Sequence, residues 1–384
     1  MSDLIPKLRF TKFNDNWNSN FIENLCTVST GNKDTQNKVD DGEFPFFVRS
    51  DKVERINTYS YDGEAVLTSG DGVGVGKNFH YINSTFDYHQ RVYCMFDFNE
   101  INGKYFYYNF STNFNRRVMK MSAKNSVDSV RRDMITKMVL TYPSLEEQTK
   151  IAEFLTSVDK QIELLETKKS KLNTYKSGLM QKLFSQELRF KDDNGNDYPE
   201  WKNSYFENEV NIIGGGTPDT TNDKFWNGEI NWFTPSEIKI KYINQSYRTI
   251  TEEGLKSSSA KILPIGTILL TTRATIGYCS ILEQIATTNQ GFQSIVVNKN
   301  NFNEFFYYWI INNRNEFIKR ATGSTFLEIS KKEILKIPIR IPSLIEQNKI
   351  ANFLTSIDQQ IDTVDQQIKK TQSFKKGLLQ QMFV

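Results

Sequence analysis

The stretch PSLEEQTKIAEFLTSVDKQI at residues 143–162 recurs as PSLIEQNKIANFLTSIDQQI at residues 342–361. The two copies match without a gap, and the match includes positions that we expect on the surface of a helix, such as Gln148 and Gln347. Two unrelated amphipathic helices share an apolar spacing, but nothing requires them to share surface residues. The chain therefore contains an internal repeat, and a long helix is its clearest part.

Each copy has the apolar spacing of a coiled-coil helix. Apolar residues alternate at intervals of four and three positions, which predicts one continuous seam. Polar residues interrupt the distal part of the seam, at Lys169 and Lys176 in the first copy and at Thr371 and Lys375 in the second. About 39 residues at roughly 1.5 Å each would form a rod of about 58 Å. The predicted seam consists of Ile151, Leu155, Val158, Ile162, Leu165, Leu172 and Leu179 in the first helix, and of Ile350, Leu354, Ile357, Ile361, Val364, Ile368 and Leu378 in the second.

The repeat extends into the segments that precede the helices. LRF occurs at residues 8–10 and again at 188–190, GEFPFFVRSD parallels GEINWFTPSE, and TSGDGVG from Thr68 parallels TTRATIG from Thr271. The chain is thus two copies of one unit, a variable globular domain followed by a long helix. The predicted boundaries are 1–142 and 187–341 for the globular domains, and 143–186 and 342–384 for the helices.

This order of elements has a geometric consequence. The second domain follows the end of the first helix, so the second helix should return antiparallel to the first, with a pseudo-twofold axis between the copies. The last residues should then lie near the first, as in a circular arrangement. Inside the domains, β-rich runs at 64–69, 91–96, 268–272 and 292–298 predict strands, while aromatic segments near 99–115 and 303–319 predict helices. We therefore expect the α/β (α+β) class: two mixed α/β domains joined by two long antiparallel coiled-coil helices.

Composition narrows the function classes. The 48 basic and 45 acidic residues nearly cancel, so any affinity for nucleic acid must come from local clusters. Three separated cysteines and two histidines argue against structural zinc and against a disulfide framework. The N-terminus MSDLIPKLRF lacks a signal-peptide core, and no run of 18 apolar residues occurs, so we expect a cytoplasmic protein that contacts no membrane.

Sequence patterns for catalysis are weak. The glycines around Gly72 lack the spacing of a phosphate-binding loop, and a tight turn is the simpler interpretation. Asp219 followed by Glu237 and Lys239 has the residue order of a metal-dependent nuclease, but Val53 replaces the lysine in the first copy. No motif for adenosylmethionine binding or for a hydrolase triad stands out. We expect no catalytic, cofactor-binding or metal-binding residue in this chain.

Three motifs carry a resemblance to a known family. They are GGGTPDTTNDKFWNGEINWFTPSEI (214–238), RATIGYCSILEQIATTNQGF (273–292) and GSTFLEISKKEILKIPIRIPSLIEQNKIANFL (323–354). Together with the doubled helix, they make the chain resemble the specificity subunit of type I restriction-modification systems. The first globular domain matches less well, with SGDGVG where the second has TRATIG.

The resemblance implies a function and a set of partners. Each globular domain would be a target recognition domain that reads one half of a bipartite double-stranded DNA site. The helices would set the spacing and dock two methylation subunits, and restriction subunits would complete the complex. Adenosylmethionine, ATP and magnesium would then be used by these partner subunits in DNA methylation and cleavage, with none bound by this chain.

Base reading needs side chains that make paired hydrogen bonds in the DNA grooves, and phosphate binding needs cations, hydroxyls or backbone amides. Loop residues beside the predicted strands are our candidates, and the arginine pairs 116–117 and 131–132 suit phosphate contacts. The predicted DNA-binding residues are Lys33, Arg49, Ser69, Asp71, His89, Gln90, Arg91, Arg116, Arg117, Arg131 and Arg132 in the first domain, and Thr217, Thr234, Ser236, Arg273, Asn289, Gln290 and Ser324 in the second.

Two other functions remain as alternatives. In the first, the chain is a coiled-coil scaffold whose domains bind proteins. In the second, disfavoured by Val53, it is a metal-dependent nuclease. A DNA reader changes its groove-facing residues while it keeps its frame, and the two copies show this pattern: RATIG and NQGF stand beside divergent loops.

Overall fold

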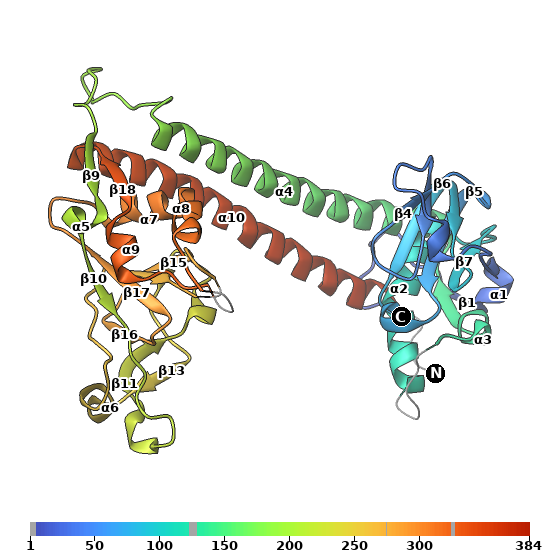
Figure 1. Ribbon diagram of the computed structural model, residues 1–384. Coiled ribbons are helices and arrows are strands. Elements are labelled where there is room, and N and C mark those ends of the chain that lie inside the picture. Colours follow the sequence, from blue (N-terminus) through green and yellow to red (C-terminus); the bar gives the residue numbers. More distant parts are fainter. Residues whose placement is uncertain (1–4, 123–128, 274, 324–326) are drawn as a thin grey trace. The chain divides into compact units, whose positions relative to one another are not determined.

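The computed structural model describes residues 5–122, 129–273, 275–323 and 327–384. The chain divides into two compact units (Figure 1). Unit 1 comprises Met1–Thr167 and Asp365–Val384, and unit 2 comprises Lys168–Val364. Each unit therefore contains one globular domain, part of helix α4 (Leu145–Ser185) and part of helix α10 (Leu344–Met382).

The domain of unit 1 contains a six-stranded sheet in the order β2-β7-β5-β6-β3-β4. Its neighbouring strands are antiparallel except β3 and β6, and a separate pair of strands, β1 and β8, leads into α4. The strands are β1 (Asn18–Phe21), β2 (Thr27–Thr30), β3 (Phe44–Phe47), β4 (Glu54–Ile56), β5 (Tyr61–Ser69), β6 (Phe79–Tyr88), β7 (Val92–Phe96) and β8 (Val139–Tyr142). The main helix of the domain is α2 (Gly103–Ser122), and the short helices are α1 (Ile22–Leu25), α3 (Arg132–Thr136), η1 (Thr35–Asn37) and η2 (Gly72–Gly74).

The domain of unit 2 contains a five-stranded sheet, β10-β17-β14-β15-β12, and a three-stranded sheet, β13-β11-β16. The pair β9 and β18 corresponds to β1 and β8. The strands are β9 (Lys202–Tyr205), β10 (Val210–Gly214), β11 (Trp226–Phe233), β12 (Tyr242–Ile243), β13 (Arg248–Ile250), β14 (Ile268–Thr271), β15 (Cys279–Leu282), β16 (Ala286–Thr288), β17 (Phe292–Val297) and β18 (Pro338–Ile341), and the helices are α5 (Phe206–Glu209), α6 (Glu252–Lys256), α7 (Asn303–Asn312), α8 (Arg314–Lys319), α9 (Lys331–Leu335), η3 (Asp223–Phe225) and η4 (Pro235–Glu237).

These elements confirm the mixed α/β class and the predicted strands and helices inside the domains. The sequence pattern explains the central helices α2 and α7, which are rich in aromatic residues. Tyr105, Phe106 and Phe110 of α2 are fully buried, and Phe305 and Phe306 of α7 are buried in the same way. Both helices pack on a sheet and on the long helices, so they join each domain to its helical part.

Within each unit, the two long helices run antiparallel. In unit 1, Ile151 of α4 belongs to the same buried cluster as Met382 of α10, and Asp159 forms an ion pair with Lys375. In unit 2, Lys176 forms an ion pair with Asp358. Of the predicted seam residues, Ile162, Leu172, Leu179 and Ile361 are partly exposed, while Ile151, Leu155, Val158, Leu165, Ile350, Leu354, Ile357, Val364, Ile368 and Leu378 are buried.

The repeated LRF segments hold the helix ends in the same way in both units. The amide of Leu8 donates to the carbonyl of Gln381 at 2.9 Å, and the amide of Leu188 donates to that of Lys182 at 3.0 Å. The described N-terminal segment therefore lies on the C-terminal end of α10, as the circular arrangement predicted.

The arginines of the two LRF segments bind carboxylates in the first turns of α4 and α10. Arg9 makes two hydrogen bonds of 2.7 Å to Glu147, and Arg189 bonds Glu346 at 3.3 and 3.1 Å. The hydrogen bonds from Arg9 to Glu147 raise the pKa of the arginine, although burial acts to lower it. A two-point contact of this kind fixes both the distance and the orientation of the segment.

One expectation about the repeated helix was wrong. Gln148 and Gln347 were expected on the helix surface, but both are buried. Each side-chain amide donates to the proline carbonyl before its own helix and accepts from a domain backbone amide, that of Asn102 at 2.7 Å or that of Phe302 at 2.8 Å. Buried backbone groups need such partners, which gives a physical reason for glutamine at both positions.

Candidate nucleic-acid interface

In unit 1, four loops, those after β2, β3, β5 and β6, bring most of the candidate residues together. Lys33 follows β2, Arg49 follows β3, and Asp71 follows β5. His89 lies between β6 and β7 and forms an isolated β-bridge with Lys33. The side chain of the next residue, Gln90, donates to Asp34 at 3.1 Å. The parallel pairing of β3 with β6 aligns the ends of these two strands, so the loops that follow them lie at one edge of the sheet.

The charged side chains at this edge form a connected cluster. Arg49 Nη1 lies 3.2 Å from Asp71 Oδ1, and Arg91 Nη1 lies 2.6 Å from Asp71 Oδ2. Burial acts to raise the pKa of Asp71, but hydrogen bonds from Arg91 and Arg49 outweigh it and lower that pKa. A hollow of about 260 Å³ adjoins this cluster, and Gln90 also lines it.

Two candidates in this unit support the frame. His89 is buried, and its Nδ1 accepts the backbone amide of Arg91 at 2.9 Å. Burial lowers the pKa of His89, with a further lowering by the charge of Arg49, so the ring favours its neutral form. Ser69 is buried as well and donates to the carbonyl of Arg49 at 3.0 Å. Both residues fix the backbone from which the arginines project.

The arginines of α2 and α3 lie in two different environments. Arg116, Arg131 and Arg132 are exposed, and Arg117 is partly exposed. Arg117 donates to the carbonyls of Met134 and Lys137, and Arg132 donates to the carbonyl of Val28 at 2.7 Å. The guanidinium groups of Arg117 and Arg132 therefore hold α3 against neighbouring elements.

In unit 2, the matching loops contain four of the candidates. Thr217 donates to the side-chain oxygen of Gln290 at 2.6 Å, which corresponds to the contact of Gln90 in unit 1. Asn289 Oδ1 accepts the amide of Gly291 at 2.9 Å, as His89 accepts that of Arg91. Arg273 forms an ion pair with Glu328 at 3.0 Å.

The remaining candidates of unit 2 lie in and beside η4, or outside the described residues. Thr234 and Ser236 share a hydroxyl contact of 3.0 Å, and Thr234 also donates to Glu237. Ser324 lies outside the described residues. Sequence reasoning missed Ser129 and Glu328, which border the charged clusters of the two units. No local sequence pattern indicates these two residues. They correspond to each other only after the strand ends of unit 1 are aligned with those of unit 2.

The carboxylates of the nuclease-like pattern are engaged by their own loops. Glu237 is buried and accepts from the amides of Thr234 and Tyr247, both at 2.7 Å. Asp219 accepts from the amide and hydroxyl of Thr221. Both carboxylates therefore stabilise local turns. Among the described residues, no group of three or more histidines, cysteines or acidic residues has the arrangement of a metal site.

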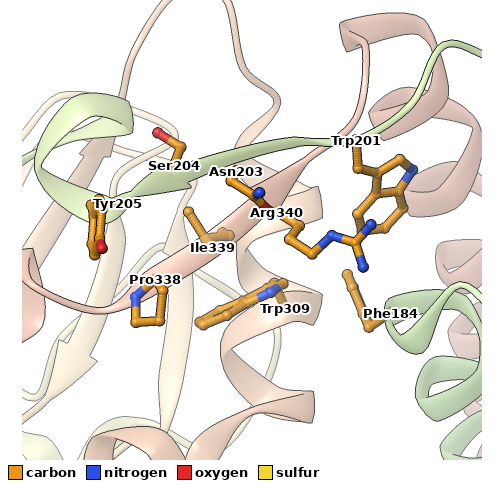
Figure 2. Close-up of a pocket in the computed structure, with 9 residues that line it drawn as sticks. All are labelled: Phe184, Trp201, Asn203, Ser204, Tyr205, Trp309, Pro338, Ile339 and Arg340. Carbon is orange, nitrogen blue, oxygen red and sulfur yellow. The ribbon is translucent and has the colours of Figure 1, made fainter.

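Unit 2 has another hollow, of about 560 Å³, at the end of α4 beside β9, α7 and β18. Figure 2 shows its lining, in which Phe184, Trp201, Tyr205 and Trp309 supply aromatic surface and Arg340 supplies a charge. None of the predicted DNA-binding residues lines it. In the part of the chain that the structure describes, no helix is long and apolar enough to cross a membrane.

Comparison with known proteins identifies the family. A family model described as "Type I restriction modification DNA specificity domain" matches twice, at residues 14–174 and 199–371. The type I restriction enzyme MjaIX specificity subunit of Methanocaldococcus jannaschii is 34% identical over 207 residues, 52% of this chain and 48% of that protein. The EcoDI specificity subunit of Escherichia coli is 22% identical over 395 residues, 95% of this chain and 86% of that protein.

The chain thus spans about half the length of the MjaIX protein in that match. Among solved structures, the S subunit of a type I restriction-modification system from M. genitalium shares the fold, with a TM-score of 0.63 over 99% of both chains and 16% sequence identity. The family model covers most of this chain and matches each repeat separately. The protein therefore belongs to the type I restriction modification DNA specificity domain family.

Proposed function

We propose that this chain is the DNA specificity subunit of a type I restriction-modification complex, in which each unit reads one half of a bipartite target. The doubled family match carries this proposal, because each of its two matched segments spans one globular domain and most of the long helix that follows it. A single DNA recognition domain binds a single DNA site. Two unlike recognition domains in one chain therefore bind two unlike half-sites.

The charge distribution supports a DNA partner. The net charge is only +3, yet exposed arginines occur in the loops and on or beside the helices of unit 1. Arg49 and Arg91 project from loops at one edge of the sheet, and Arg116 and Arg131 are exposed on or beside α2 and α3. Local clusters of this kind supply both phosphate attraction and base contacts in proteins whose overall charge is small.

The long helices have a separate role in this proposal. They set the spacing between the half-sites, and their exposed faces dock two methylation subunits. Charged and amide side chains cover these faces, among them Lys160, Glu163, Lys171 and Gln380. Restriction subunits complete the complex, and adenosylmethionine, ATP and magnesium are bound by the partners. In the complex this chain reads the sequence and catalyses no step, and its site of action is the cytoplasm.

A binding selection tests the function. The full chain, co-expressed with methylation subunits, is incubated with a pool of random duplexes, and the retained DNA is sequenced. Two short conserved blocks with a fixed gap are the expected result. A scaffold that binds only proteins would retain no DNA, and binding without conserved blocks would contradict sequence recognition. Sequencing of methylated adenines in cells with and without the gene should give the same two blocks.

A further inference from the structure

The charged cluster of unit 1 is an arrangement of two arginines around one carboxylate. Each oxygen of Asp71 accepts from a different arginine, Arg49 or Arg91. The Asp71 side chain is only 13% exposed, whereas the arginine side chains are 47% and 63% exposed. Asp71 therefore faces inward and orients two guanidinium groups, which keep further N–H donors on the solvent side.

The backbone beneath the cluster is fixed by hydrogen bonds. The carbonyl of Arg49 accepts from Ser69 at 3.0 Å and from Asn78 at 2.9 Å, and the carbonyl of Arg91 accepts the amide of Gly70 at 2.8 Å. A side chain at Gly70 would lie 2.8 Å from that carbonyl, so glycine permits the close approach. The two arginines thus project from points that the fold determines.

Strand register identifies the matching positions in unit 2. On one side of the strand, Ser69 of β5 pairs with Val92 of β7, as Thr271 of β14 pairs with Phe292 of β17. On the other side, Thr68 pairs with Phe79 of β6, as Leu270 pairs with Cys279 of β15. Both neighbouring strands therefore align Ser69 with Thr271. The similarity of TSGDGVG to TTRATIG matches Thr68 with Thr271, which is one residue out of register, because the loop after β5 is longer than the loop after β14. In the corrected register, Asp71 corresponds to Arg273.

Three further positions of the cluster have counterparts. Phe47 pairs with Tyr88 in unit 1, as Phe233 pairs with Thr288 in unit 2. Counting onward from these pairs matches Arg49 with Pro235. It also matches Arg91 with Gly291. The amide of Val130 donates to Gly70, and the amide of Ile329 donates to Thr272, which aligns Ser129 with Glu328. Pro235 and Gly291 also meet in unit 2, where an added side chain at Gly291 would lie 2.7 Å from Pro235 Cγ.

All four matched positions have chemically different side chains in the two units, although the contacts around them are the same. Unit 1 has two arginines, an aspartate and a serine, while unit 2 has a proline, a glycine, an arginine and a glutamate. The neighbouring contacts are the same in both units, since His89 and Asn289 each accept the amide two residues later. Such a pattern separates the residues that build the edge from those that distinguish the two units.

We infer that these four positions set the base preference of each unit, and that Arg49 and Arg91, oriented by Asp71, recognise a G·C pair in one half of the target. The inference rests on the proposed function and deepens it. An arginine fork matches the O6 and N7 acceptors of guanine in the major groove. Orientation by Asp71 means that less side-chain freedom is lost on binding.

Unit 2 carries one oriented arginine at this edge. Arg273 is 52% exposed, and its Nε lies 3.0 Å from Glu328 Oε1. Unit 1 presents two guanidinium groups, those of Arg49 and Arg91, whereas unit 2 presents that of Arg273 at a different one of the matched positions. The two units therefore offer different patterns of hydrogen-bond donors. The two half-sites should therefore differ at the bases that face this edge.

The test uses Arg91→Lys in the full chain with its methylation subunits, in the binding selection described above. Lysine keeps the positive charge for phosphate attraction but loses the bidentate fork. The expected result is loss of the guanine preference at one position of one block, with a roughly 5- to 150-fold lower affinity for the original target. The other block should stay unchanged, which also shows that the variant is folded.

Two further variants make the outcome specific. Asp71→Asn keeps the shape but removes the orienting charge, so the same position should become less selective. Arg273→Lys should relax one position of the opposite block only. An unchanged guanine preference in Arg91→Lys would overturn the inference, as would an equal loss of affinity for every sequence, which would assign Arg91 to phosphate binding. If the original chain selects no blocks at all, the proposed function itself fails.

Discussion

Lys375 Nζ of α10 lies 2.5 Å from Asp159 Oδ1 of α4, and the second oxygen of Asp159 accepts the hydroxyl of Tyr108 at 2.7 Å. The same three partners recur in unit 2, where Asp358 accepts from Lys176 and from Tyr308. Two of the four polar positions that interrupt the predicted seam, Lys176 and Lys375, thus bind the aspartate of the facing helix, and that aspartate also accepts from a domain tyrosine. They fix the register of two antiparallel helices, which apolar contacts alone specify less strictly.

Replacing Lys375 with glutamate should therefore destabilise unit 1. The substitution places two carboxylates together, and we expect the free energy of unfolding to fall by about 1 kcal/mol, since the pair is partly exposed to solvent. Urea denaturation followed by circular dichroism measures the change. Lys376→Glu, at the exposed neighbouring position, is the control and should have little effect. If both substitutions lower the free energy of unfolding equally, the change in net charge is the cause, and the ion pair with Asp159 contributes nothing specific.

Loss of Arg9 should have a larger effect. Arg9→Ala leaves the carboxylate of Glu147 buried without its cation, because the Glu147 side chain has no exposed surface. Breaking a buried pair in this way costs about 3–5 kcal/mol. Thermal and urea unfolding should show the loss, and the double variant Arg9→Ala/Glu147→Gln should recover part of it. No recovery in the double variant would indicate that packing of the arginine stem, and not the unpaired charge, sets the cost.

The buried His89 predicts a dependence of stability on pH. Its pKa in the folded protein is lowered, mainly by burial, so below pH 6.5 the unfolded chain binds a proton that the folded chain resists. The free energy of unfolding should therefore fall as the pH decreases from 7.5 to 5.5. His89→Asn removes this titration and keeps the acceptor, as Asn289 does in unit 2.

The measurement compares urea denaturation of the two proteins at both pH values. The variant should lose less stability on acidification than the original chain. His80 is present in both proteins, and its pKa is lowered too, so it contributes equally to both curves. Identical losses in the two proteins would mean that His89 does not titrate between these pH values.

A circularly permuted chain should fold. In unit 2, five residues separate Lys182 from Leu188. Joining Val384 directly to Pro6 places five residues between Gln381 and Leu8, so the new connection matches the natural one in length. New termini between Gln186 and Glu187 would then replace the old ones. We expect unchanged circular dichroism and DNA selection, whereas a junction shortened by three residues should prevent the Leu8 contact and lower the unfolding temperature.

Under the proposed function, helix length should set the gap between the half-sites. Removing one heptad between Asp159 and Lys176, and one between Asp358 and Lys375, shortens each helix by about 10 Å while keeping the apolar phase. At about 3.4 Å per base pair, the gap in the selected DNA should shorten by about 3 base pairs. Removing four residues from each helix breaks the heptad phase and should abolish selection of a fixed gap. A gap that ignores the heptad deletion would contradict a spacer role.

Sequence alone determined the features that are local and periodic. Heptad spacing predicted both long helices, and the doubled motifs predicted two copies of one α/β unit, because each signal is complete within a few dozen residues. The return of the C-terminus to the LRF segment also followed from the repeat.

Only the tertiary structure decided which residues meet across the chain. Gln148 looked like a surface residue because its partner, the amide of Asn102, is 46 positions away. Asp71 and Arg273 were misaligned by one position until strand pairing on both sides fixed their register. Burial and register are set by long-range contacts that leave no periodic trace in a single sequence, so the repeat could be predicted but the chemistry of its variable edge could not.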